Sequence, residues 1–110
     1  MTDSGLPYNI DDLRKCCADK HVVWKEHSTE RMIERSIFRQ EVFQCIQNGE
    51  IIEKYPDDHP YPSCLVYGVT DKGRPLHVVC SLCGGYVYMI TVYEPNTFKW
   101  YPDLKTRKEQ

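Results

Sequence analysis

The chain has 110 residues, 41% of them hydrophobic and 27% charged, which is the size and composition of one globular domain rather than of a disordered chain. Its net charge of −2 argues against strong non-specific attraction to nucleic acid, although a local basic patch is compatible with it. No apolar run approaches the roughly 20 residues of a membrane span, and the N-terminus lacks a secretory signal. We therefore expect a cytoplasmic protein with no membrane partner, whose six cysteines are thiols.

The first half of the chain predicts helices. Asn9, followed by Asp12, is typical of an N-cap, and the spacing predicts a helix from there to about Lys20. The short β-rich stretch His21–Glu26 can form an edge strand before the next helix. We treat residues 1–6 as a disordered N-terminus.

Two further helices follow. Ser28 is the expected N-cap of a helix that runs to about Arg35. The third helix is expected from near Arg39 to Asn48, and Gly49 after it fits a C′ residue with positive φ.

The second half of the chain changes to a period of two. Four segments rich in Val, Ile, Thr and Tyr predict strands: Ile51–Tyr55, Cys64–Val69, Leu76–Leu82 and Tyr86–Tyr93. Short turns at 71–73 and at Gly84-Gly85 make the last three antiparallel neighbours. The fold class is therefore α+β, with N-terminal helices packed on a four-stranded antiparallel meander and an optional short edge strand. We expect a single domain over residues 7–102 and a flexible tail over 103–110.

Three basic side chains lie at helical spacing in the second predicted helix. His27, Arg31 and Arg35 follow i, i+4, i+8, a pattern that can bind an anion through two guanidinium groups. Glu30 and Glu34 alternate with them and can pair with the arginines. Such charges are common on solvated helix faces, and this structural interpretation has the higher prior.

A histidine lies in the middle of the predicted meander. If the 71–73 turn is a three-residue loop, Tyr67 lies opposite His77, and Tyr93 lies near the end of the neighbouring strand. A histidine with phenols on an open sheet face can act as an acid–base pair. A hydrogen-bonded structural histidine is the more common outcome.

The pair Cys80 and Cys83 has the spacing of half a zinc site. No second CxxC or HxxxH accompanies it, and residues 80 and 83 of a straight strand point to opposite faces. Cys64 is the only other thiol in the meander that can join them. We therefore expect no metal and no other cofactor. The sequence also lacks a dinucleotide fingerprint and a phosphate loop.

Several short sequence motifs along the chain form a recognisable set. They are His27-x3-Arg31-Met32-x2-Arg35, Glu41-Val42, Asn48–Tyr55, Tyr61–Leu65, Arg74–Val79 and Ile90–Pro95 with Trp100. Together, over residues 21–101, they resemble a bacterial and archaeal family of small proteins, domain of unknown function 4258 (DUF4258). The chain departs from the family at Ser36, where members often have Gly, and at Phe38, where they often have a capping residue.

The resemblance implies a function by analogy. Family members are similar to the RelE/ParE/BrnT-like toxins, whose helices pack on a curved antiparallel sheet and which cleave mRNA as partners of an antitoxin protein. A metal-free ribonuclease needs a base, a cation for the phosphate and an acid. The candidates are listed by role: His27 or His77 as base or acid, Arg31 and Arg35 on the phosphate, Tyr93 as a second proton donor, and Glu53 as an alternative base.

Two other functions compete with the ribonuclease. The meander carries many aromatic residues, among them Tyr67, Tyr86, Tyr88 and Tyr93, with Trp100 nearby. This surface suits a non-catalytic module that binds a protein or a small ligand equally well. A small zinc-binding protein is the third and weakest alternative.

Overall fold

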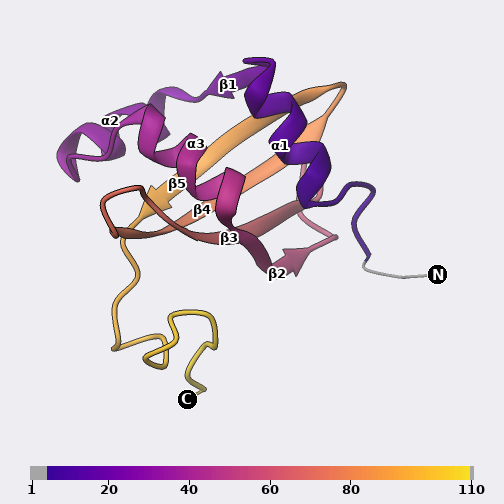
Figure 1. Cartoon of the computed structure of the whole chain (residues 1–110). Helices are drawn as coiled ribbons and strands as arrows, with labels where there is room; N and C mark the ends of the chain where they lie inside the picture. Colours follow the sequence, from indigo (N-terminus) through magenta and orange to yellow (C-terminus); the bar gives the residue numbers. More distant parts are fainter. Residues whose placement is uncertain (1–4, 110) are drawn as a thin grey trace.

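The computed structural model describes residues 5–109. The residues at positions 1–4, where a disordered end was predicted, and residue 110 lie outside the described part. Within residues 5–109 the chain forms three helices and five strands (Figure 1). The helices are α1 (Ile10–Ala18), α2 (Glu26–Glu34) and α3 (Arg39–Asn48), and the strands are β1 (Val22–Trp24), β2 (Glu50–Tyr55), β3 (Ser63–Val69), β4 (Pro75–Cys83) and β5 (Tyr86–Tyr93). No helix in the described range is long and apolar enough to cross a membrane.

The five strands form one sheet in the order β1-β5-β4-β3-β2. The predicted meander is confirmed, because β2 to β5 pair with their chain neighbours in antiparallel fashion. The optional edge strand is also present, and β1 pairs in parallel with β5. The sheet therefore has five strands and one parallel pairing, rather than four strands that are all antiparallel.

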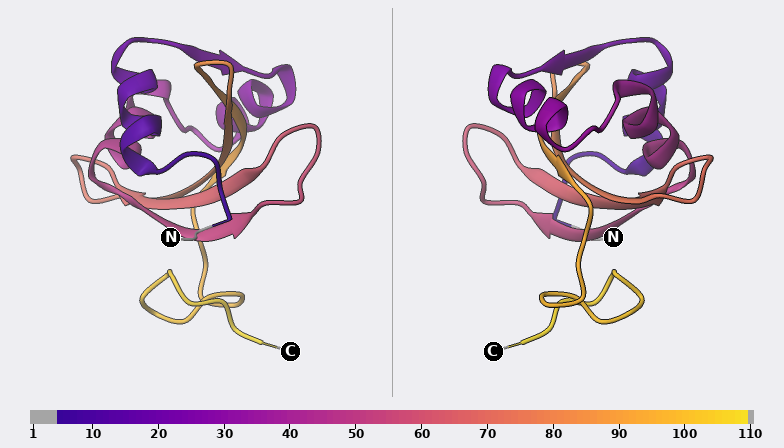
Figure 2. Two further views of the ribbon diagram at one scale, coloured as in Figure 1. Left: turned by 90° about the vertical axis from the view of Figure 1, so that its right-hand side faces the viewer. Right: turned by 90° about the vertical axis from the view of Figure 1, so that its left-hand side faces the viewer.

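The helices cover one face of the sheet, which we call the inner face, and the other is the outer face (Figure 2). Apolar side chains from all three helices and from β3, β4 and β5 form the core between them. Cysteines contribute as small apolar groups: Cys17 and Cys45 are buried, and burial raises the pKa of each thiol to about 12. Among the described residues all six cysteines are unpaired by disulfides, as predicted.

Local signals explain the helix ends only in part. At α1 the predicted capping box forms, with Asn9 and Asp12 exchanging hydrogen bonds of 2.9 and 3.0 Å. At α2 the predicted N-cap is wrong, because the helix begins three residues earlier and Lys25 is the capping residue. Ser28 is buried inside the first turn, where its hydroxyl donates to the Lys25 carbonyl at 2.8 Å.

Gly49, which follows α3, is not the C′ residue with positive φ that was predicted. Gly49 has a φ of −96°, so it does not use the left-handed conformation. Instead, a Cβ on Gly49 would lie 2.3 Å from the Cys45 carbonyl oxygen, and a Cβ on Gly68 of β3 would lie 2.2 Å from the same atom. The two glycines let α3 approach the sheet closely.

Both departures from the family pattern lie in the junction between α2 and α3. Ser36 has a φ of +55°, a left-handed conformation that favours glycine. Phe38 is the N-cap of α3 and has no capping side chain, but its backbone N–H donates to Glu41 at 3.0 Å. Arg74 secures the junction by donating to the carbonyls of Arg35 and Ser36.

After β5 the chain turns back beneath the sheet. Residues 94–109, which we call the C-terminal segment, lie on the outer face (Figure 2). The segment is held together by a bridge between Trp100 and Arg107 and by an Asp103 carboxylate that accepts from the N–H of Thr106 at 3.0 Å. It also contacts the sheet through Lys105 and Arg107, so residues expected to form a flexible tail have defined contacts.

Candidate functional site

His77 lies on the outer face, near the start of β4. The register places it between Tyr67 on β3 and Tyr93 on β5, which confirms the predicted neighbours. The ring centroids of His77 and Tyr67 are 5.9 Å apart, and those of His77 and Tyr93 are 5.3 Å apart. Strand alternation alone therefore brings an imidazole and two phenols together.

The C-terminal segment completes the surroundings of His77. The Trp100 ring lies perpendicular to the imidazole with centroids 4.5 Å apart, and the Leu104 carbonyl oxygen is 2.7 Å from Nε2. Both His77 and Trp100 are almost fully buried, with 0% and 2% of their surface exposed. The site is therefore closed by the protein's own chain.

The hydrogen bonds define the tautomer of His77. A carbonyl oxygen can only accept, so Nε2 carries the proton that is donated to Leu104. In the neutral ring Nδ1 is then an acceptor, and the Tyr93 hydroxyl donates to it at 3.3 Å. The unprotonated Nδ1 of His77 consequently lies directly beside the phenol proton of Tyr93.

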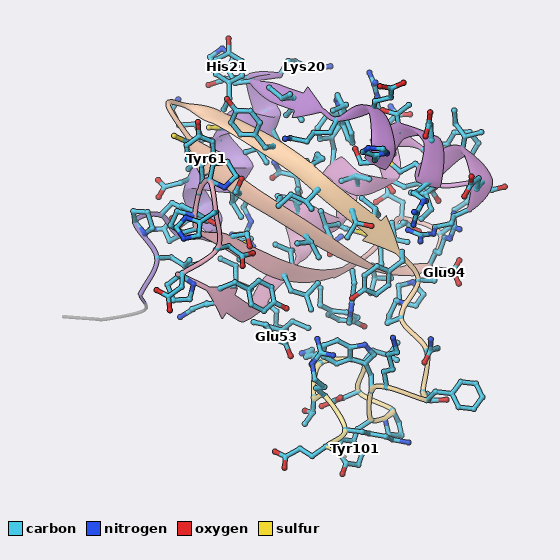
Figure 3. All side chains as sticks on the ribbon, turned by 180° about the vertical axis from the view of Figure 1, so that it is seen from behind. Lys20, His21, Glu53, Tyr61, Glu94 and Tyr101 are labelled. Atoms are coloured by element: carbon cyan, nitrogen blue, oxygen red, sulfur yellow. The ribbon has the colours of Figure 1, made fainter. Side chains whose placement is uncertain are left out.

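Glu53 of β2 brings a carboxylate to the same face. It accepts two hydrogen bonds of 3.0 Å from Arg107, and it accepts a further one from the Tyr55 hydroxyl. The Arg107 guanidinium also lies over the Trp100 ring, 4.6 Å from its centroid. Figure 3 shows Glu53 on the side of the sheet nearest the C-terminal segment.

The surroundings shift the ionisation of these groups in different directions. Burial lowers the pKa of His77 below its ordinary value, and it raises the pKa of Tyr93. The hydrogen bonds from Arg107 lower the pKa of Glu53. At neutral pH the cluster therefore holds a neutral imidazole, a protonated phenol and an ionised carboxylate, which is a base beside an acid.

The structure brings some of the candidate residues together and leaves others apart. Arg35, at the end of α2, donates to the Val92 carbonyl at 2.7 Å and to the Thr91 hydroxyl at 3.5 Å, so it reaches the edge of β5 next to Tyr93. His27 and Arg31 are exposed on α2, a helix that covers the inner face. They are therefore separated by the sheet from His77.

The cysteine candidates for zinc do not converge. Cys64 and Cys80 face each other across β3 and β4 and are fully buried on the inner face. Cys83 is on the outer side, where its thiol interacts with Tyr61. Cys80 and Cys83 thus point to opposite faces, as alternation predicts. Within residues 5–109 no group of three or more His, Cys, Asp or Glu side chains is placed to hold a metal ion.

Sequence reasoning missed the residues that close the site. Leu104 contributes a backbone carbonyl, which has no signature in the sequence, and Arg107 lies where a flexible tail was expected. The one available signal was the group of apolar and aromatic residues near the end of the chain, Phe98, Trp100, Tyr101 and Leu104, which is unusual for a flexible tail.

Comparison with known proteins defines the family. A family model described as "Domain of unknown function (DUF4258)" matches residues 24–94, which is well over half of the chain. The chain therefore belongs to this family. No curated protein and no solved structure shows a significant match. The matched region contains His77, Tyr93 and Glu53, and it ends at Glu94, before the covering part of the C-terminal segment.

Proposed function

We propose that this protein is a metal-independent ribonuclease of the toxin type, which cleaves RNA on the outer face of its sheet. The observation that carries the proposal is the contact between His77 and Tyr93 beside the Glu53 carboxylate, because it combines a neutral base and a protonated acid. The resemblance of the family to RelE-type toxins is an analogy that adds to this chemistry and does not replace it.

The proposed reaction is attack of a ribose 2′-hydroxyl on the adjacent phosphate. His77 accepts the 2′-hydroxyl proton while the new O–P bond forms, and Tyr93 donates a proton to the 5′-oxygen as its bond to phosphorus breaks. The products are a 2′,3′-cyclic phosphate and a 5′-hydroxyl end. Arg35, beside Thr91 and Tyr93, supplies positive charge for the phosphorane, and Glu53 is the alternative base.

In this proposal the structure is a resting state, since the C-terminal segment covers His77. The segment is attached through charged groups: Arg107 binds Glu53, and Lys105 lies 2.7 Å from Glu50. RNA phosphates are alternative partners for these two cations, and guanidinium groups bind phosphate as well as carboxylate. RNA can thereby compete with the two glutamates and expose the imidazole.

The proposal also implies a protein partner. A cytoplasmic toxin of this class is expected to be encoded beside an antitoxin, and the antitoxin would bind the toxin and suppress its activity. Expression of the chain alone is expected to arrest growth and degrade cellular RNA. Coexpression of the product of an adjacent small reading frame is expected to restore growth.

The proposal is tested by opening the site before measuring activity. Trp100→Ala removes the ring that covers His77, so this variant is expected to cleave a mixed-sequence RNA faster than the wild type. Adding His77→Ala to Trp100→Ala should lower the rate by a factor of roughly 100 or more. His27→Ala on the same background is the matched control, and it should leave cleavage unchanged because His27 lies on the helix side.

A second candidate function is a non-catalytic binding module. It is favoured by one observation, that both nitrogens of His77 already have partners and that the ring is fully buried. If the folded Trp100→Ala variant cleaves no RNA, or if the activity persists without His77, the ribonuclease proposal is refuted and the binding module becomes the better account.

A further inference from the structure

The C-terminal segment leaves part of the outer face open. This part is a groove of about 250 Å³ beside the second half of β4 and the first half of β5, which we call the Tyr61 groove. Its lining residues come from the β2–β3 connection, from β4 and β5, and from the start of α2: Lys25, Asp58, His59, Pro60, Tyr61, Ser81, Tyr88 and Ile90. None belongs to the C-terminal segment, so the groove is accessible while His77 is covered.

We propose that the Tyr61 groove binds a nucleobase of single-stranded RNA. The inference rests on the proposed function, for which it supplies a substrate-binding subsite outside the reacting groups. The groove is smaller than the usual 300–1,000 Å³ of a small-molecule pocket, so it suits one ring system rather than an extended ligand.

Two tyrosines give the groove its aromatic wall. The Tyr61 and Tyr88 rings are tilted by 32° with centroids 5.7 Å apart, and the Tyr61 side chain also interacts with the Cys83 thiol. Tyr61 is 37% exposed, so part of its ring is available to a ligand. Base–aromatic stacking is tolerant of sequence, because every base has a π face.

Polar groups in the groove fit the edges of a base. Ser81 is 4% exposed at the floor and its hydroxyl can donate or accept. Asp58 accepts a hydrogen bond from Ser63 through Oδ2 and keeps Oδ1 as an acceptor, the type of group that takes an exocyclic amino proton. A carboxylate would repel a phosphate, so the groove itself is suited to the base and the rim to the backbone.

One lysine of the groove, Lys25, supplies positive charge for the backbone. Lys20 and His21 lie outside the groove, at the same end of the molecule (Figure 3), and Lys20 borders a separate pocket with Trp24 and Arg39. The His21 ring stacks on Tyr86 with centroids 5.0 Å apart, which extends the aromatic surface beyond the groove. Alternating aromatic and basic side chains are typical of surfaces that bind single strands.

The groove also has a suitable position relative to the proposed site. Ser81 follows His77 by four residues on β4, which corresponds to about 13 Å along a strand. Both side chains lie on the outer face. A short stretch of extended RNA can therefore place one base in the groove and the scissile phosphate near His77.

Binding is tested without cleavage by using a fluorescently labelled 2′-O-methyl RNA oligonucleotide of mixed sequence, which lacks the attacking hydroxyl. Tyr61→Ala in the full chain is expected to weaken binding at least fivefold, since stacking on an aromatic side chain contributes about 1–3 kcal/mol per base. Tyr61→Phe keeps the ring and should stay within twofold of the wild type. Tyr101→Ala is the matched control, because Tyr101 is an exposed tyrosine outside the groove.

The outcomes separate this inference from the proposed function. If the wild type does not bind the oligonucleotide, or if Tyr61→Ala binds as tightly as the wild type, the inference is wrong, whatever the chain does to cleavable RNA. If Tyr61→Ala weakens binding while no variant cleaves unmodified RNA, the groove is an RNA-binding site and only the ribonuclease proposal fails.

Discussion

The two faces of the sheet are covered in different ways. The inner face buries apolar residues such as Val66 and Val78 beneath three helices, and it has little polar chemistry. The outer face is covered by an irregular segment that is held by directed contacts, chiefly the Leu104 carbonyl on His77 and the Arg107–Glu53 pair. Burial of apolar area is non-directional and holds a domain together, whereas a few directed contacts can be exchanged for others. The outer cover is therefore the part that can open while the domain stays folded.

The largest effect is expected on the inner face. Gly68→Ala places a Cβ 2.2 Å from the Cys45 carbonyl oxygen, so α3 must move away from β3. We expect the free energy of unfolding to fall by about 3 kcal/mol, measured by urea denaturation. The control is Gly73→Ala, whose Cβ meets nothing within 4 Å and whose cost of about 1 kcal/mol comes from positive φ alone. Equal losses in the two variants would contradict the close approach of α3.

A smaller effect is expected from opening the outer face. Trp100→Ala should lower the free energy of unfolding by about 2 kcal/mol, since the loss is limited to the docking energy of the segment. Amide hydrogen exchange should become fast for the N–H groups of Tyr101 and Lys108, while β4 stays protected. Loss of protection throughout the sheet would mean that the two faces are not independent.

The pH dependence of stability distinguishes the buried imidazole from the exposed ones. The folded-state pKa of His77 is lowered, so below about pH 6.5 the unfolded chain takes up this proton more readily than the folded one. Stability should therefore fall as the pH decreases from 6.5 toward the folded pKa, by at most about 1.4 kcal/mol per pH unit. His77→Gln should remove this slope and His27→Gln should keep it, as followed by denaturation at a series of pH values. A slope that survives His77→Gln belongs to another group.

The smallest effect concerns the ion pair on the outer face. Glu53→Gln removes the charge that binds Arg107, whose side chain is 49% exposed, so we expect a loss of only about 0.5 kcal/mol. The difference from the wild type should shrink in high salt, because exposed charges are screened. A loss that is large and independent of salt would show that this pair, rather than Trp100, holds the segment.

Strand bounds and register were predicted correctly where they depend on residues that are close in the chain. Alternation and the Gly84-Gly85 turn gave β5 its correct bounds, and the register around His77 followed from the turn before it. The start of α2 was misplaced because Ser28 has the chemistry of an N-cap but is used inside the helix.

The cover of the site was beyond sequence reasoning for a physical reason. Leu104 acts through a backbone carbonyl, and Arg107 contacts a carboxylate 54 residues away in the chain. Neither contact leaves a local pattern of residues. Ser36 is the opposite case, because the sequence did indicate its conformation. Family members often have glycine at this position, and the φ of Ser36 is indeed positive.

The parallel pairing of β1 with β5 has a consequence for synthesis on the ribosome. Within residues 5–109 the earliest strand, β1, pairs with the last one, β5, and α2 also packs on β5. Chain growth is vectorial, so β1 and α2 must wait without their sheet partner until β5, which ends at Tyr93, has emerged. The family match begins at the last residue of β1 and ends just after β5, so its C-terminal limit coincides with the point at which the nascent chain can complete its sheet.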